Sequence, residues 1–294
     1  MTDNENERDL ADRKFYRAGE ESRFAEEAPD RTPQTEHPAY KLAFRDTDFL
    51  LRDELRPVRF QLELLKPEML LDEARVGSTL VMYGSARIPA PEEVEVKLEA
   101  AKGKSEFEQK VAERLAAKAK YYDEAYKLSR MVSEKAIIED GKRQFVVVTG
   151  GGPSIMEAGN RGASDAGSES IGLNIILPHE QAPNSYVTPY LSLNFHYFAL
   201  RKMHFLLRAR AVAVFPGGFG TFDEMFELLT LVQTGKMKPL PILLFGREFW
   251  ERIIDFEAFA EEGTISKKDL DLFQWCETAE EAWEHIAQFY ELSR

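Results

Sequence analysis

Short apolar runs alternate along this chain with longer stretches in which apolar residues recur every three or four positions. A continuous apolar run predicts a buried strand, and the longer spacing predicts an amphipathic helix. From about residue 78 the two patterns follow one another to the end of the chain. Strands are predicted at 79–83, 144–149, 170–177, 191–195, 211–215, 241–245 and 273–276. Helices are predicted at 105–138, 154–166, 198–210, 221–234, 249–259 and 279–292.

Strands that alternate with helices indicate a parallel sheet covered on both faces. The predicted strands are apolar almost throughout, as burial on both faces requires. A closed (β/α)₈ barrel needs eight strand–helix units, and the pattern offers only about six or seven. We therefore expect an α/β fold with an open, doubly wound, mostly parallel sheet, which is a Rossmann-like architecture.

The segment before residue 78 follows other patterns. Residues 1–40 are acidic and have few aliphatic side chains, which predicts a disordered leader because little apolar surface can offset the ordering entropy. Between 46 and 74 apolar residues return at helical spacing, with Pro57 and Pro67 as breaks or starts. The expected organisation is a leader at 1–40, an N-terminal helical extension at 41–77 and the α/β domain at 78–294.

Charge and composition narrow the range of partners. The net charge of −13 argues against a nucleic-acid partner, which would need clustered Lys and Arg. Cys276 is the single cysteine, so no intrachain disulfide is expected and a reducing compartment fits. The acidic N-terminus lacks the apolar segment of a signal peptide, and no apolar run has membrane-spanning length. We expect a cytoplasmic protein without a membrane partner.

Three predicted strands end in glycine turns, which are YGSAR at 83–87, TGGGPS at 149–154 and FPGGFGT at 215–221. The carboxyl ends of parallel strands meet at one edge of a sheet, where ligands collect. Glycine lets the backbone approach a ligand closely, and the start of the next helix offers N–H groups and a partial positive charge. One such turn is common for steric reasons alone. Three together predict an extended anionic ligand, held by backbone at Gly84, Gly151, Gly152, Gly217, Gly218 and Gly220.

The turns do not match the common nucleotide fingerprints. The chain has no G-x-x-x-x-G-K-[ST] sequence, and its first turn is GSAR instead of G-x-G-x-x-G. A P-loop nucleoside triphosphatase and a dinucleotide-binding protein are therefore disfavoured. No group of His, Cys, Asp and Glu has the spacing of metal ligands, so no metal or other cofactor is expected.

Two further features permit alternative interpretations. Thr221 and Glu224 have the spacing of a capping box, but Glu224 would equally face a ligand beside the glycine loop. Arg201 and Lys202 form a basic pair that is either solvated or directed at an anion, where Arg would form a fork and Lys a point charge.

These motifs resemble the Lonely Guy (LOG) family of nucleotide phosphoribohydrolases, once widely labelled lysine decarboxylases. The resemblance rests on GGGPSIMEAGNRGA at 150–163, on RKM at 201–203 and on PGGFGTFDE at 216–224. Every fixed position of the family pattern PGG-x-GT-x-x-E is matched. The long leader and the insertion before the first long helix resemble the larger bacterial branch, which includes purine and pyrimidine 5′-monophosphate nucleosidases. The similarity covers roughly 78–290, so this domain would be the catalytic one.

The resemblance implies a role for each matched residue. Arg201 and Glu224 would form the catalytic pair, and the PGGFGT loop would hold the 5′-phosphate through Gly217, Gly218, Gly220 and Thr221. Ser85 and Arg87 would line the ribose-phosphate end, and Glu180 falls where the family places a substrate-binding carboxylate. Lys202 would be a further substrate contact. The family also implies a homo-oligomer, at least a dimer, with sites near the subunit contact.

The implied reaction cleaves the N-glycosidic bond of a nucleoside 5′-monophosphate and releases the base and ribose 5-phosphate. AMP-like nucleotides are the expected substrates, with cytokinin ribotides as an open alternative. Glu224 would stabilise the positive charge that develops on the ribose or activate the attacking water, while Arg201 keeps it oriented and ionised. Stacking on the base and plain core packing are equally open for five residues, Met156, Phe195, His196, Tyr197 and Phe198.

Two competing hypotheses remain. A lysine decarboxylase would need pyridoxal phosphate and a lysine placed to form a Schiff base with it. Lys202 is the only lysine beside the proposed site. A non-catalytic nucleotide sensor or carrier would use the same pocket, but it would not need both Arg201 and Glu224.

Overall fold

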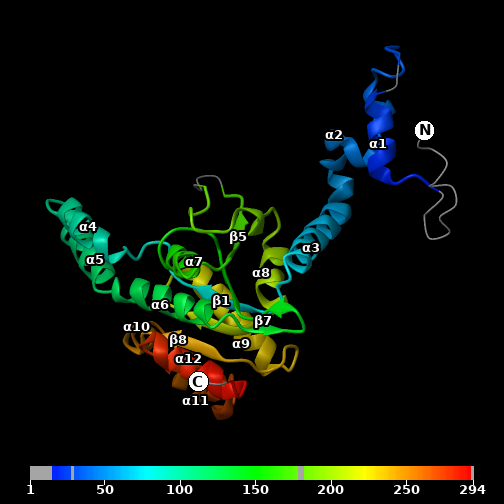
Figure 1. The fold of residues 1–294 in the computed structure, drawn as a ribbon. Coiled ribbons are helices and arrows are strands. Elements are labelled where there is room, and N and C mark those ends of the chain that lie inside the picture. Colours follow the sequence, from blue (N-terminus) through cyan, green and yellow to red (C-terminus); the bar gives the residue numbers. More distant parts are fainter. Residues whose placement is uncertain (1–14, 28–29, 178–181, 293–294) are drawn as a thin grey trace. The chain divides into compact units, whose positions relative to one another are not determined.

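The structure is a computed structural model that describes residues 15–27, 30–177 and 182–292. The chain divides into two compact units, Met1–Gln61 and Leu62–Arg294. In the described ranges no helix combines the length and the apolar character needed to cross a membrane. The larger unit contains the whole central sheet (Figure 1).

The central sheet has seven strands in the order β6-β5-β4-β1-β7-β8-β9, and each neighbouring pair is parallel. From β1 the chain builds outward through β4, β5 and β6, and it then returns to β7 and builds outward on the other side. The predicted open, doubly wound α/β fold is thereby confirmed. The strands are β1 (Thr79–Tyr83), β4 (Val146–Thr149), β5 (Ile171–Ile175), β6 (Ser192–Phe195), β7 (Ala209–Val214), β8 (Ile242–Phe245) and β9 (Gln274–Cys276).

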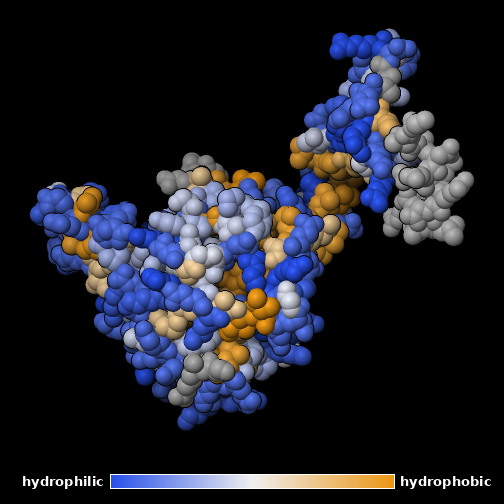
Figure 2. Space-filling view, viewed as in Figure 1, coloured by the Kyte–Doolittle hydropathy of each residue, from blue (hydrophilic) through white to orange (hydrophobic). Residues whose placement is uncertain are grey.

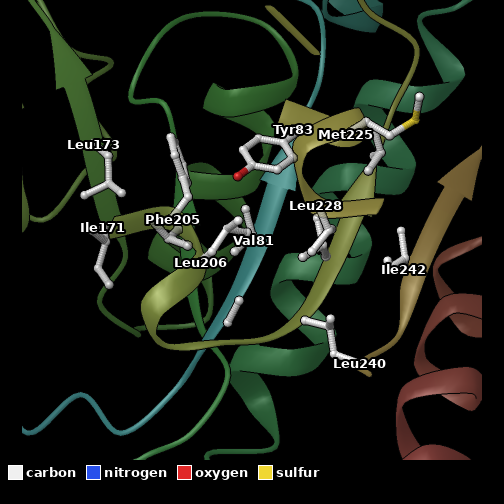
Figure 3. Packing of buried hydrophobic residues seen from close by; sticks show 14 of the residues in the cluster. Val81, Tyr83, Ile171, Leu173, Phe205, Leu206, Met225, Leu228, Leu240 and Ile242 are labelled. Atoms are coloured by element: carbon white, nitrogen blue, oxygen red, sulfur yellow. The ribbon is translucent and has the colours of Figure 1, made fainter. Parts of the chain in front are cut away.

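Helices cover both faces of this sheet because successive side chains of each strand point to opposite faces. Leu80 and Met82 of β1 pack with the helices α6 (Lys120–Glu134), α7 (Ile155–Asp165) and α12 (Ala279–Phe289). Val81 and Tyr83 point the other way. They lie in the second cluster, with α8 (Phe198–Leu207), α9 (Phe219–Gln233) and α10 (Arg247–Ile253), and Figure 3 shows part of this packing.

The predicted helix 105–138 is two helices, α5 (Glu106–Ala116) and α6. Ser105 and Glu108 form a capping box that starts α5. The short links Lys118 N–H to Leu115 O and Ala119 N–H to Ala116 O tighten the backbone after Ala116, so the helical path changes direction there. A helix α4 (Val94–Ala101) lies between β1 and α5, where no helix was predicted.

Two smaller elements also differ from the expected pattern. A hairpin of β2 (Ile138–Glu139) and β3 (Lys142–Arg143) turns at Asp140 and Gly141, both with positive φ. The predicted helix 249–259 is divided into α10 and α11 (Phe256–Glu261), since the Asp255 carboxylate accepts the N–H of Ala258 and starts a new helix.

Within the smaller unit, α1 (Ala18–Glu27) and α2 (Thr47–Leu50) bury no residue. The helix α1 lies in the stretch expected to be a disordered leader, whose residues 1–14 and 28–29 lie outside the described ranges. Its lack of buried residues agrees with the low apolar content of the leader. The disordered state of 1–40 stays a prediction.

The helix α3 (Arg56–Glu73) supplies the helical extension expected from the apolar pattern. Its second half belongs to the larger unit, which begins at Leu62 instead of 78. Glu63 is one reason, because its carboxylate accepts the backbone N–H groups of His196 and Tyr197 ahead of α8. The helix also carries exposed apolar side chains, which include Leu65 and Met69. Figure 2 shows hydrophobic surface, in orange, along this helix. The expected homo-oligomer stays a prediction.

Candidate active site

A cavity of about 770 Å³ opens at the carboxyl ends of β1 and β7, where the strand order reverses. This is the place at which open parallel sheets bind ligands. Two backbone hydrogen bonds hold the turns together: Phe215 N–H donates to Tyr83 O (2.8 Å) and Ser85 N–H to Pro216 O (3.1 Å). The structure thus brings the first and third glycine turns into one site.

The third turn leads directly into α9. Gly218 is the residue before the helix, so the helix begins at Phe219 and not at Thr221 as predicted. Thr221 therefore lies inside the first turn, where it cannot cap, and the capping-box interpretation of Thr221 and Glu224 is wrong. A Cβ on Gly217 would collide with the Thr221 hydroxyl, so this tight arrangement requires glycine.

Glu224 lies on the second turn of α9 and lines the cavity. Its side chain is buried, and its Oε2 atom has no hydrogen-bond partner among the described residues. Burial raises the pKa of the Glu224 carboxyl to about 7, and the charges of Lys202 and Arg201 offset only part of that rise. A buried carboxyl with an unused oxygen beside an anion-binding loop is an arrangement typical of functional sites.

Arg201 reaches the same cavity from α8. Its Nε donates to Leu173 O of β5 (2.7 Å), and its guanidinium lies over the Phe205 ring, 5.2 Å from the centroid. A Cβ on Gly150 would lie 2.8 Å from Arg201 Nη2, so the second glycine turn leaves space for the guanidinium. These contacts fix the position of the positive charge.

Tyr83 is a site residue that the sequence analysis missed. It ends β1, lines the cavity and is 6% exposed, and its hydroxyl has no partner among the described residues. Burial, followed by the charge of Glu224, raises the pKa of the Tyr83 phenol well above its ordinary value. The hydroxyl therefore stays protonated and can donate a hydrogen bond. A tyrosine at the end of an otherwise aliphatic strand, directly before GSAR, was the available signal.

Most of the predicted site residues line the cavity. They are Gly84, Ser85, Arg87, Arg201, Gly217, Gly218, Gly220, Thr221 and Glu224. The expected base-flanking residues Met156 and Phe198 also line it, whereas Phe195 is buried in the core. Exposed apolar rings, including Phe219, add surface on which a planar group can stack.

Gly151 and Gly152 do not line this cavity; Gly150 does. The Asn184 amide donates to the carbonyls of Gly151 (3.1 Å) and Gly152 (2.9 Å), and a Cβ on Gly151 would collide with Asn174. The second turn is therefore closed by side chains from distant parts of the chain, and these two glycines serve the turn itself.

Two other predicted polar contacts have different outcomes. The Lys202 ammonium forms ion pairs with Asp223 and Glu227, both at 2.9 Å, and does not line the cavity. Glu180 lies outside the described residues. The described ranges contain no group of three or more His, Cys, Asp or Glu residues arranged to hold a metal ion.

Comparison with known proteins finds similarity to one family over the part of the chain that carries this site. Residues 156–286, which include Arg201 and Glu224, match the sequence model of a family described as "Possible lysine decarboxylase". The cytokinin riboside 5′-monophosphate phosphoribohydrolase LOG2 of Arabidopsis thaliana is 27% identical over 153 residues, which are 51% of this chain and 67% of that protein. Over these residues the chain is similar to the LOG family. The resemblance seen in the motifs is confirmed, and the larger bacterial branch of the family stays a prediction.

Solved structures with a similar arrangement include two proteins of low sequence identity. The X-ray structure of TM1055 is 19% identical, with 72% of this chain and 99% of that chain covered and a TM-score of 0.43. The Moco carrier protein from Chlamydomonas reinhardtii is 15% identical, with 73% and 98% covered and a TM-score of 0.42.

Proposed function

We propose that this protein hydrolyses the N-glycosidic bond of nucleoside 5′-monophosphates, with free base and ribose 5-phosphate as products. One observation carries the proposal. The buried Glu224 carboxyl, whose Oε2 has no hydrogen-bond partner in the described part of the chain, lies in the same cavity as the PGGFGT loop at the start of α9. The homology to LOG2, a phosphoribohydrolase of nucleoside monophosphates by name, supports the same reaction class.

The loop end of the cavity suits the 5′-phosphate. The first N–H groups of an α-helix have no partner within the helix, and those of α9 begin at Phe219. With the helix dipole they favour a dianion, to which Thr221 can add its hydroxyl. Ser85 and Arg87 line the same cavity from the turn after β1. Phosphate binding here holds the ribose in place, so its binding energy serves orientation at the reacting carbon.

Glu224 and Arg201 are the catalytic residues of the proposed reaction. As the bond from C1′ to the base nitrogen breaks, its electron pair leaves with the base and positive charge develops on C1′ and O4′. The ionised Glu224 stabilises this charge and takes a proton from the water whose oxygen bonds to C1′. The departing base then accepts a proton. A pKa of about 7 suits a group that gains and loses a proton near neutral pH.

The positions of the neighbouring charges disfavour a lysine decarboxylase. Formation of a Schiff base requires a neutral amine. Burial alone would lower the pKa of the Lys202 ammonium, but its hydrogen bonds to Asp223 and Glu227 raise it above the ordinary value. Lys202 is thus held as a cation outside the cavity. A Schiff-base absorbance band in the purified protein, which we do not expect, would favour the decarboxylase.

The decisive experiment is incubation with nucleoside 5′-monophosphates, including a cytokinin ribotide, and with the matching nucleosides, followed by chromatography of released bases. We expect release from at least one monophosphate and not from its nucleoside. Glu224→Gln should abolish release, while Glu227→Gln, one turn further along α9, should retain it. Binding of AMP without release of any base would instead favour the nucleotide sensor.

A further inference from the structure

A second cavity, of about 240 Å³, lies beside the glycine loop. It shares five lining residues with the first cavity, which are Ser85, Arg87, Gly217, Gly218 and Phe249, so the two spaces meet at the phosphate loop. Its remaining wall comes mainly from the end of α5 and the residues after it. A ligand group in this cavity would therefore lie next to a phosphate bound at the loop.

Three cations line the second cavity, and they are Arg87, Arg114 and Lys118. None of them forms an ion pair with a carboxylate in the part of the chain that the structure describes. Two nearby lysines do form ion pairs with carboxylates: Lys110 pairs with Glu106, and Lys120 pairs with Glu277. The contrast is notable because Asp and Glu outnumber Lys and Arg by 51 to 38 in this chain.

The position of Lys118 is fixed by two contacts. Its ammonium donates to Arg114 O at 2.8 Å and lies 5.8 Å from the centroid of the Phe249 ring. Burial is the main cause of the lowered pKa of Lys118; the charges of Arg114 and Arg252 lower it further, and the charge of Glu248 raises it. An anion in the cavity would stabilise the charged form of this partly buried ammonium.

We propose that the second cavity binds a second phosphate-type anion beside the one held by the PGGFGT loop. This inference rests on the proposed phosphate site for the position of the first anion. Arg114 and Lys118 would supply charge-assisted hydrogen bonds from one side, while Gly217 and Gly218 let the loop backbone approach from the other. The anion is either the next phosphate of the same nucleotide or a separate phosphate compound.

Calorimetric titration of the full-length protein with inorganic pyrophosphate tests the site. We expect the double variant Arg114→Gln and Lys118→Gln to bind pyrophosphate roughly tenfold or more weakly than the unaltered protein, because two charged donors are lost. Lys110→Gln, on an exposed part of the same helix, is the matched control and should bind as the unaltered protein does. Equal affinity in all three proteins would overturn the proposal, provided that their melting temperatures agree.

A second pair of titrations identifies the source of the anion. If both phosphates belong to one nucleotide, ADP binds more tightly than AMP, and the double variant loses that preference. If the anion is separate, pyrophosphate still binds when AMP is saturating. If ADP binds no more tightly than AMP and saturating AMP abolishes pyrophosphate binding, the protein has no second anion site. These readouts need no turnover, so failure to release base would reject the proposed reaction and leave the test of the second cavity intact.

Discussion

Arg201 and Arg208, near the start and just after the end of α8, lie beside carboxyl groups whose pKa values are shifted in opposite directions. Arg208, which follows the last residue of α8, donates to Glu68 (2.8 Å), Asp72 (3.3 Å) and Val76 O (2.5 Å). Hydrogen bonds from Lys142 and then Arg208 lower the pKa of Asp72. Arg201, near the start of α8, lies in a cavity with Glu224, whose pKa is raised to about 7 by burial.

The two clusters have similar residue types and opposite pKa shifts. Around Arg208 the charges are paired and hold α3 against the sheet, which is a structural task. Around Arg201 a carboxylate oxygen and the Tyr83 hydroxyl are buried without partners among the described residues. Such groups cost stability, so their presence in a cavity indicates selection for a ligand. The direction of the pKa shift distinguishes the functional cluster from the structural one.

The largest expected effect is on turnover. Glu224→Gln keeps the shape of the side chain but removes the charge that stabilises the developing cation. We expect kcat for base release to fall by about 10²- to 10⁴-fold, and Arg201→Ala should also abolish turnover. Steady-state kinetics with the best monophosphate measures the loss, and a melting curve verifies the fold. Near-normal turnover in either variant would remove that residue from the catalytic pair.

The pH dependence of stability gives the next largest effect. The folded-state pKa of Glu224, about 7, lies above its ordinary value of 4.5, so the folded protein keeps the proton longer than the unfolded chain does. The contribution of Glu224 to stability should therefore fall as the pH rises from 4.5 to 7, by at most about 3 kcal/mol, and then level off. Because other carboxyls also titrate in this range, the difference in the free energy of urea unfolding between the unaltered protein and Glu224→Gln measures this contribution and should follow that fall. Identical pH slopes would contradict the raised pKa.

A substitution in the cluster around Arg208 should lower stability without changing activity. Arg208→Ala removes the donor of Glu68 and of the Val76 carbonyl, while Asp72 keeps its hydrogen bond from Lys142. We expect a loss of about 2 kcal/mol in the free energy of unfolding. The activity of the molecules that remain folded should not change. Arg130→Ala, which breaks an exposed ion pair with Glu134 on α6, is the control and should leave the free energy of unfolding nearly unchanged. A fall in kcat with Arg208→Ala would erase the distinction between the clusters.

Much of the fold could be predicted because it is encoded locally. The apolar runs and helical spacings identified the strands of the parallel sheet, and the glycine turns located the edge at which the cavity opens. The hairpin at Asp140 and Gly141 was also predictable, since an Asp-Gly pair favours this turn. The break after Ala116 was harder, because nothing in that alanine-rich stretch marks a helix end.

The rest of the site depends on contacts between distant segments. Gly151 and Gly152 have the same sequence signal as the glycines of the third turn, yet Asn174 and Asn184 decide that they face away from the cavity. The start of α9 at Phe219 follows a Gly218 that offers no capping side chain. Likewise, the sequence identifies a tyrosine at the end of a strand but not whether its hydroxyl finds a partner.

Tyr83→Phe is the change with the smallest expected effect. It removes a buried hydroxyl that has no partner in the described structure, so stability should stay level or rise by under about 1 kcal/mol. If the hydroxyl donates to the bound ribose or to Glu224, kcat/KM should fall about tenfold. Melting curves and steady-state kinetics on one preparation measure both quantities. Lower stability with unchanged kinetics would mean that the Tyr83 hydroxyl stabilises the folded protein and does not contact the ligand. Tyr83 would then have a structural role only.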